Sequence, residues 1–391
     1  MKIRSVEAFA VRVPRDIGAA TGLAGSPTVL AGGKGDYRWS QTYPALYSTN
    51  FETALIKITM EAGMVGWGEA QAPLAPEVAC TIVRLLLEPV LVGQEVHGTV
   101  SGIEQLWMKM YSTMRVRGQT GGFMLDAISG VDIALWDIVG KMAGLPVSEL
   151  IAPGKARAHV PAYISGLAGA NKLDAARPYV ERGFALFKLF HDGDWPAMLH
   201  SVDQLRSADL GVAVDALWRL EPETAVEMAT ELDPRRVHWL EAPLPPEDPV
   251  AHTVLRRAIQ TPVAIGESYR TTFELKTFIL ARAMQIIQPD LGRTGITEGL
   301  RIAAMGGDHG MKIVPHVSIA MGPQVAAAVH FAAAVPNCSL LEYNPSVLDM
   351  ANRFLREPLV IRDAGYAVPQ TPGLGIEIDE DRLAAVVSRG V

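Results

Sequence analysis

The hydrophobic pattern of the chain changes at residue 158, where short apolar runs begin to alternate with stretches of helical periodicity. Eight such runs can be read, and each is six or seven residues long with mostly β-branched, aliphatic and aromatic side chains: HVPAYIS, FALFKLF, GVAVDA, VHWLEAP, PVAIGES, QIIQPD, KIVPHV and SLLEYN. Strands that alternate with helices predict a parallel sheet, and eight of them match a barrel of about 250 residues. We therefore expect an α/β fold built on a TIM-type barrel.

A polar residue ends nearly every run, at almost constant spacing. These residues are Lys188, Asp215, Glu241, Glu267, Asp290, His316 and Glu342, separated by 27, 26, 26, 23, 26 and 26 residues. A fixed period of this size is typical of a repeated strand–loop–helix unit. In a barrel, the period places all of these side chains at the carboxyl-terminal rim, where barrel enzymes carry their active sites.

The segment before the barrel predicts a separate α+β unit. Residues 3–13 alternate like a strand, and residues 53–70 read as a hairpin that turns at Glu61-Ala62-Gly63. Helical periodicity follows near 76–88, 101–114 and 123–143. The tail after Pro358 is rich in proline and glycine with two short strand-like pieces, and we expect it to leave the barrel and pack on the N-terminal unit. The predicted domains are residues 1–125, 126–358 and 359–391.

Two features of the first 143 residues have more than one interpretation. The glycine-rich residues 18–35, followed by Tyr37, Arg38 and Trp39, are either disordered or form a functional loop such as an active-site lid. Three acidic residues on the helix near 123–143 resemble ligands, but we interpret them as solvated or salt-bridged helix charges: Asp126, Asp132 and Asp137.

Composition narrows the class of protein. Of the 391 residues, 49% are hydrophobic, enough for a large core, and the net charge of −7 argues against a nucleic-acid-binding surface. Two cysteines do not make a disulfide framework, and the N-terminus has no signal-peptide pattern. Residues 319–335 are the most apolar late stretch but are too polar for a membrane span. We expect a cytoplasmic protein with no membrane partner.

Three carboxylates on successive strand ends indicate a metal site. Asp215, Glu241 and Glu267 offer only oxygen ligands, which suit Mg²⁺ or Mn²⁺. The alternative is that they pair with basic residues at the rim.

The next two strand ends carry a candidate base. Asp290 can accept the Nδ1 proton of His316 from the adjacent strand, which fixes the imidazole tautomer and raises its basicity. Lys188 can hold a carboxylate or stabilise developing negative charge, and Glu342 can bind an enolate oxygen or substrate hydroxyls. Together with a metal ion these groups suit removal of a proton α to a carboxylate, giving a metal-stabilised enediolate.

The whole chain resembles the mandelate racemase subgroup of the enolase superfamily. The motifs that carry the resemblance are GWGEA at 66–70, DIALWDIVGK at 132–141, WLEAP at 239–243, IGES at 265–268, IIQPDLGRTGITE at 286–298, HGMKIVPHV at 309–317 and PGLGIEI at 372–378. It implies a modified (β/α)7β barrel with an α+β capping domain formed by both termini, whose N-terminal loops around residues 18–43 select the substrate. It also implies a homo-oligomer, either a dimer or an octamer.

The resemblance assigns roles to the strand-end residues. By it, Asp215, Glu241 and Glu267 bind Mg²⁺, Asp290 and His316 form the catalytic dyad, and Glu342 is the electrophilic acid. Further candidates for substrate contact are Tyr163, Ser165, Arg270, Tyr37, Arg38 and Trp39.

Departures from the family pattern limit the reaction. Many members have Lys-x-Lys on the second strand, but here the position of the second base is Phe190, followed by His191. Leu217 and Ala242 also replace polar residues that are common in the family. Racemisation needs two bases, whereas β-elimination needs one, so we predict dehydration of a sugar acid, an aldonate or aldarate.

Three alternatives remain open at this point. A cycloisomerase or lactone-opening enzyme uses the same single base, and a racemase or epimerase would need a second one. The third alternative is a catalytically silent homologue that only binds its ligand. The sequence does not identify the acid, its stereochemistry or the oligomeric state.

Overall fold

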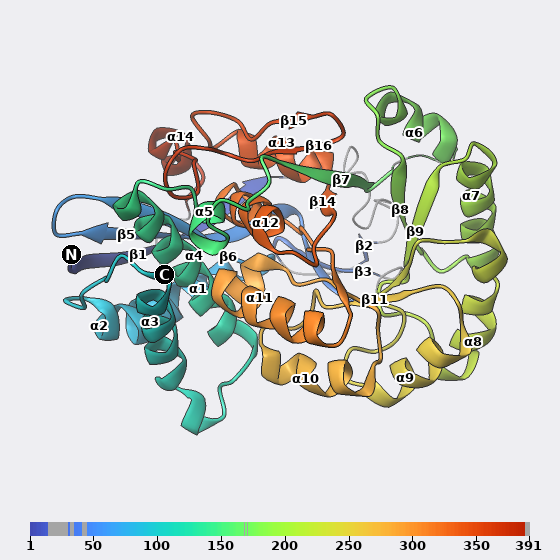
Figure 1. Ribbon diagram of the computed structural model, residues 1–391, viewed down its shortest axis with the longest axis horizontal. Coiled ribbons are helices and arrows are strands. Elements are labelled where there is room, and N and C mark those ends of the chain that lie inside the picture. The colour runs from blue at the N-terminus through green and yellow to red at the C-terminus, as the bar shows by residue number, and fades with distance from the viewer. Residues whose placement is uncertain (15–29, 32–34, 41–44, 168, 170, 388–391) are drawn as a thin grey trace.

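The computed structural model describes residues 1–14, 30–31, 35–40, 45–167, 169 and 171–387. An antiparallel sheet covered by helices lies beside a larger parallel α/β unit (Figure 1). The predicted fold class, a modified (β/α)7β barrel with an α+β capping domain, is confirmed.

The capping sheet has the order β1-β5-β6 and is antiparallel. The predicted hairpin is confirmed, since β5 and β6 are joined at residues 61–64 and the Met60 amide donates to the Met64 carbonyl at 2.8 Å. The elements of this part are β1 (Ile3–Pro14), β5 (Asn50–Met60), β6 (Val65–Ala70), α1 (Pro76–Ile82), η2 (Val83–Leu87), α2 (Glu88–Leu91), α3 (Val100–Ser112) and η3 (Arg115–Arg117).

Helix α4 (Gly122–Ala143) joins the capping sheet to the barrel. Its residues from Met124 to Gly140 are all buried, because β6 covers one side and helix α11 (Leu291–Asp308) the other. The approach to β6 is so close that a Cβ atom on Gly68 would overlap the carbonyl oxygen of Gly130. Glycine at both positions therefore allows backbone-to-backbone packing. Helix α5 (Val147–Ile151) follows and leads into the first barrel strand.

The barrel strands are parallel and run in chain order from β7 to β13, with β14 paired to β7. The barrel closes between β13 and β14. There the Ile313 amide of β13 donates to the carbonyl of Asn337, shortly before β14, at 2.9 Å. The strands are β7 (His159–Ser165), β8 (Leu186–Phe190), β9 (Gly211–Asp215), β10 (Leu240–Glu241), β11 (Val263–Ile265), β12 (Ile286–Ile287), β13 (Lys312–Ile313) and β14 (Leu341–Tyr343).

Helices between the strands form the outer layer (Figure 1). Several begin with a side-chain cap, such as Thr271, whose hydroxyl and the Glu274 carboxylate form a capping box at the start of α10. These elements are α6 (Lys172–Val180), α7 (Trp195–Ser207), α8 (Pro222–Thr230), η4 (Asp233–Arg235), α9 (Pro249–Ala258), α10 (Thr272–Ala281), α11 and α12 (Pro323–Ala334).

The chain after the barrel returns to the capping sheet. Following α13 (Pro345–Asn352), strands β15 (Ile361–Arg362) and β16 (Gly365–Ala367) pair with each other, and β16 pairs with β7. Helix α14 (Glu380–Ala384) then reaches the N-terminal strands. There the Val386 carbonyl accepts from the Arg12 amide at 3.1 Å, and Glu380 pairs with Lys57 at 2.6 Å.

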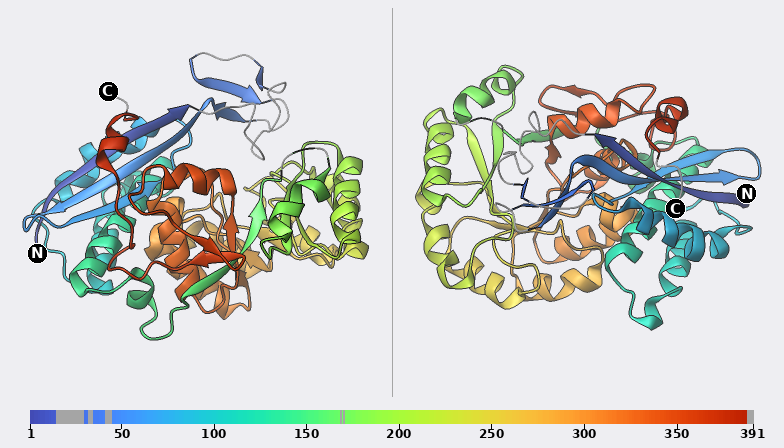
Figure 2. Two further views of the ribbon diagram at one scale, coloured as in Figure 1. Left: turned by 90° about the horizontal axis from the view of Figure 1, so that it is seen from above. Right: turned by 180° about the vertical axis from the view of Figure 1, so that it is seen from behind.

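A small antiparallel sheet of β2 (Leu30–Ala31), β3 (Tyr37–Ser40) and β4 (Leu46–Ser48) extends from the capping sheet above the barrel (Figure 2, left). It contains the described part of the segment predicted as a lid. The remainder of that segment, residues 18–29, 32–34 and 41–43, lies outside the described residues.

Candidate active site

A cavity of about 360 Å³ opens at the carboxyl-terminal ends of the barrel strands. Residues of the loop and strand β4 line its outer side, so the segment next to the predicted lid does border the barrel mouth. The full lining is Ala45, Tyr47, Ser165, Phe190, Asp215, Leu217, Trp218, Arg219, Glu267, Ser268, Arg293, His316, Val317, Ser318, Glu342 and Asn344.

Two predicted metal ligands, Asp215 and Glu267, line this cavity, and the third, Glu241, is buried beside them. Asp215 ends β9, Glu241 ends β10, and Glu267 follows β11 by two residues. One oxygen from each carboxylate lies within 4.8 Å of the others. The repeat spacing thus brings residues more than fifty positions apart in sequence to a single point.

Neighbouring donors orient two of these carboxylates. The indole of Trp239 and the amide of Gln288 donate to Oε2 of Glu241 at 2.9 and 2.7 Å. The indole of Trp218 donates to Oε1 of Glu267 at 3.1 Å. Three oriented carboxylates with only oxygen donors match the preference of a hard divalent cation, so the residues fit a Mg²⁺ site.

Lys188 is the buried counter-ion of this group. Its Nζ lies 2.5 Å from Glu241, 3.0 Å from Glu342 and 3.6 Å from Asp215. Burial alone would lower the pKa of Lys188, but these carboxylates outweigh it and hold the pKa well above its usual value. For Asp215, burial and the charge of Glu241 raise the pKa well above its ordinary range. The ammonium therefore offsets part of the repulsion among the carboxylates.

His316 faces this group from β13's end. Its Nδ1 lies 2.8 Å from Oδ2 of Asp290, which is the predicted contact, and its Nε2 lies 3.3 Å from Oε2 of Glu267. Burial lowers the pKa of His316, but the carboxylates of Glu267, Glu342 and Asp290 together raise it to about 10. The charge of Glu267 is the largest of the raising effects, so a cation engaged with Glu267 would bring the pKa of His316 down.

Glu342 completes the floor on β14. It accepts from the Val317 amide at 3.1 Å and pairs with Lys188. Burial would raise the pKa of Glu342, but the charges of Lys188 and His316 lower it to about 2. In this arrangement Glu342 is an ionised carboxylate rather than an acid, and its electrophilic role stays a prediction.

The other predicted substrate residues lie in different places. Ser165 lines the cavity, whereas Tyr163 is fully buried below it and packs edge-on against Trp239 at 5.1 Å. Arg270 forms two hydrogen bonds with Asp126, at 2.9 and 3.1 Å, and does not line the cavity.

The three residues from the predicted lid are also outside the cavity lining. The Tyr37 hydroxyl donates to Glu52 at 3.0 Å, Arg38 donates to the Tyr37 carbonyl at 2.9 Å, and Trp39 is 45% exposed. Their proposed contact with substrate stays a prediction.

The second strand has the predicted apolar residue in the cavity. Phe190 lines it, whereas His191 is buried on the other side of the strand end, with its ring 5.3 Å from that of Trp195. Burial and the nearby charge of Arg219 lower the pKa of His191. Phe190 therefore faces the site, and His191 does not.

Sequence reasoning missed Trp218 and Arg219, which follow Asp215 on the loop. Leu217 and Trp218 both have left-handed backbone angles, with φ of 53° and 60°. Two successive non-glycine residues in this region are uncommon and often mark functional sites. The turn directs Trp218 to Glu267 and Arg219 into the cavity. In the sequence, the signal for these two residues was their position shortly after Asp215, a predicted metal ligand.

The acidic residues of α4 are structural but not solvated, which corrects part of the prediction. Asp126, Asp132 and Asp137 are each no more than 2% exposed. Asp126 pairs with Arg270 and Asp137 with Lys141, whereas Asp132 accepts hydrogen bonds from Thr297. The apolar spacing of α4 did not reveal that both sides of the helix are covered.

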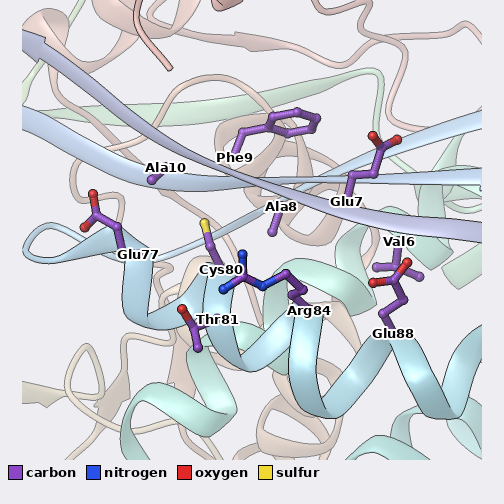
Figure 3. Close-up of a pocket in the computed structure, with 10 residues that line it drawn as sticks. All are labelled: Val6, Glu7, Ala8, Phe9, Ala10, Glu77, Cys80, Thr81, Arg84 and Glu88. Atoms are coloured by element: carbon purple, nitrogen blue, oxygen red, sulfur yellow. The ribbon is translucent and has the colours of Figure 1, made fainter. Parts of the chain in front are cut away.

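A second hollow of similar volume lies between β1 and helices α1 and η2 (Figure 3). Ala8 and Ala10 face the helices, whereas Phe9 points to the opposite side of the strand. Burial raises the pKa of the Cys80 thiol in this hollow to about 12, and Glu77 is paired with Arg12. Neither group is set up for catalysis, so the barrel mouth is the candidate active site.

The fold and the site define a class: a barrel enzyme with a capping domain, three clustered carboxylates that fit a metal ion, and a histidine–aspartate pair. Residues 47–152 match the sequence profile of the mandelate racemase / muconate lactonizing enzyme N-terminal domain, and residues 172–382 match the enolase C-terminal domain-like profile. The chain belongs to the mandelate racemase/muconate lactonizing enzyme family of the enolase superfamily. The predicted divisions at residues 125 and 358 stay predictions.

The names of two similar proteins state an activity. The chain is 33% identical to D-galactarolactone cycloisomerase of Agrobacterium fabrum over 84% of this chain and 89% of that protein. It is 33% identical to D-galactonate dehydratase of Verminephrobacter eiseniae over 83% and 88%. The crystal structure of an enolase superfamily member from Agrobacterium tumefaciens superposes with a TM-score of 0.92, at 29% identity, over 100% of this chain and 99% of that one.

Proposed function

We propose that the protein is a Mg²⁺-dependent lyase that removes the proton α to the carboxylate of a sugar acid and dehydrates it to a 2-keto-3-deoxy acid. One observation carries the proposal. Among the described residues that line the cavity, His316 is the one imidazole, it lies beside the acidic group, and the position of a second base is Phe190. The substrate class comes from the named relatives, which act on sugar acids or their lactones.

Four polar side chains have a part in this reaction. His316 takes the α-proton at Nε2 while Asp290 holds Nδ1–H, which keeps the imidazole oriented. The carbon–oxygen bond at the β-carbon then breaks, and the imidazolium returns its proton to the departing hydroxyl, which leaves as water. The enol product tautomerises to the 2-keto-3-deoxy acid. Lys188 holds one substrate carboxylate oxygen, and Ser165 contacts the substrate from β7.

Asp215, Glu241 and Glu267 would hold Mg²⁺. When bound, the ion supplies positive charge that stabilises the enediolate formed on proton loss.

A cycloisomerase activity is the second candidate. The relative from Agrobacterium fabrum is named a D-galactarolactone cycloisomerase, and breaking a ring carbon–oxygen bond uses the same single base. Racemisation or epimerisation is less well supported, because Phe190 has no proton to give on the opposite face. We also propose a homo-oligomer, a dimer or an octamer, which light scattering of the purified protein tests. None of the described helices is long and apolar enough to cross a membrane.

The decisive test uses His316→Asn. This variant should keep its affinity for Mg²⁺ but lose exchange of the α-proton in D₂O, because no other imidazole or lysine is among the described residues that line the cavity. A positioned base contributes about 10²–10⁴-fold, so residual exchange should fall by at least that factor. The measurement is ¹H NMR of a panel of aldonates, aldarates and their lactones, with isothermal calorimetry for the metal.

Products separate the candidates. Dehydration gives a 2-keto-3-deoxy acid, ring opening consumes only lactones, and a binding homologue exchanges no proton in the wild type. If the wild-type protein epimerises C2 of the substrate at a rate comparable to turnover, the proposal of a single base is refuted.

A further inference from the structure

A buried carboxylate of the capping sheet reaches the barrel. Glu69, on β6, is fully buried and accepts hydrogen bonds from the Thr53 hydroxyl at 2.9 Å, the Met321 amide at 2.7 Å and the Gln324 amide at 3.1 Å. Within the described part of the chain, no ion pair of Glu69 with a basic side chain is found. Burial raises its pKa to about 7. Such a group is costly to bury, and the reaction described above does not use it.

Glu69 stabilises the start of α12. Gln324 is the second residue of that helix, and its amide is one of the N-terminal groups that have no acceptor within the helix. A carboxylate at this end also interacts favourably with the helix dipole. The contact therefore fixes where α12 begins relative to the capping sheet.

The side chain of Gln324 continues the contact to the dyad. Its Nε2 donates to Oδ1 of Asp290 at 2.9 Å, and Gln324 is fully buried. The amide nitrogen must face Asp290, because an ionised carboxylate only accepts. The Gly292 amide donates to the same Oδ1 at 2.9 Å, and Oδ2 faces His316. Asp290 is thus held by donors on both oxygens.

We propose that Glu69 and Gln324 are positioning residues through which the capping domain sets the orientation of the Asp290–His316 dyad. The inference rests on the proposed function only in taking that dyad as the base. Glu69 places the first turn of α12, Gln324 on that turn holds Asp290, and Asp290 orients the imidazole. Loss of the Gln324 donor would leave Oδ1 with a single partner and make Oδ2 a stronger acceptor for His316.

The test compares Gln324→Met, which removes the donor at similar volume, with Glu69→Gln, which weakens the anchor. The control is Asp137→Asn, because Asp137 also binds β6, at the Trp67 amide 2.9 Å away, but has no contact with the dyad. We expect kcat to fall about tenfold to a hundredfold in both test variants, with KM and Mg²⁺ affinity within about twofold of wild type. The double variant should lose less than the product of the two effects.

A second readout is independent of any substrate. In ¹H–¹⁵N NMR of protein with labelled histidine, the Nδ1–H signal of His316 should shift in Gln324→Met and Glu69→Gln but not in Asp137→Asn. If the proposed substrate is wrong, this signal still tests whether Glu69 and Gln324 orient His316 through Asp290. An unshifted signal together with wild-type kcat in both test variants would overturn the proposal, as would an equal loss of kcat in Asp137→Asn.

Discussion

Lys188 has the most charged surroundings of any described lysine in the barrel, with contacts to three carboxylates. Without it, Asp215, Glu241 and Glu342 would share a buried space with no nearby ammonium. Removing one partner of a buried ionic group costs about 3–5 kcal/mol, because the charge left behind remains desolvated. The same residue therefore bears on both stability and catalysis.

Lys188→Met should lower kcat by at least about 100-fold, because it removes the ammonium that stabilises negative charge on the substrate. The metal-free variant should also be destabilised by about 3–5 kcal/mol, and Mg²⁺ should restore more stability to it than to wild type. Urea unfolding in EDTA and in excess Mg²⁺ checks both effects. Lys141→Met removes an ion pair with Asp137 far from the cavity and should show no such Mg²⁺ dependence. Equal Mg²⁺ effects in the two variants would contradict the prediction.

At the scale of single residues, the predicted metal ligands could be found from the sequence because they recur at a nearly constant spacing, each at the end of a strand. Gln324 and Arg219 could not, because their places depend on the backbone of loops and helix starts rather than on a period. Arg270 follows Glu267 by three residues, but its guanidinium binds the buried Asp126 and does not line the cavity, so its contact with substrate stays a prediction.

At the scale of elements, the junction of β6 with α4 depends on glycine. A Cβ at position 68 would meet the backbone of Gly130 and Ala134, which cannot move as a flexible side chain could. We expect Gly68→Ala to destabilise the protein by about 1–3 kcal/mol through overpacking.

Gly98→Ala is the matched control. There the nearest atom to an added Cβ is the flexible end of Met142 at 3.4 Å, so the change should be tolerated. Thermal unfolding of the two variants beside wild type makes the comparison. A Gly68→Ala protein as stable as Gly98→Ala would show that β6 and α4 can separate without cost.

Most elements were predictable from periodicity, and the exceptions have physical reasons. The hairpin of β5 and β6 has a polar glycine turn between apolar strands, which is a local signal. Strands β15 and β16 lie in the tail, where two short strand-like pieces were predicted. Sequence pattern does not show how they pair, because β16 joins β7, a non-local contact, and β15 joins β16.

At the scale of the whole molecule, His330 connects three separate regions. From α12 its Nε2 donates to the Leu374 carbonyl at 3.0 Å in the tail, and its Nδ1 faces the Ser148 amide of α5 at 3.3 Å. Burial lowers the pKa of His330 to about 4, whereas an unfolded histidine has a pKa near 6.5. Protonation would place a second N–H against the Ser148 amide.

The sign of the pH effect follows from these values. Between pH 6.5 and 4 the unfolded chain binds a proton that folded His330 does not, so its contribution to stability is complete above pH 6.5 and is lost as the pH falls. His330→Gln keeps a donor for Leu374 but does not titrate. Relative to wild type, we expect the variant to gain about 3 kcal/mol on going from pH 7 to pH 4. Denaturant unfolding across this range measures the difference, and a constant gap between the two proteins would refute the assignment.

The contact between the two ends of the chain has a consequence for how the protein is made. Strand β1 leaves the ribosome long before Val386, which accepts a hydrogen bond from Arg12 of β1, and before Glu380, which pairs with Lys57 on β5. During translation the barrel strands can pair in order. The edge of the capping sheet at β1 stays partly uncovered until the tail emerges. A nascent chain at that stage holds its metal ligands before its cap is finished, and the cell must keep that edge from other strands in the meantime.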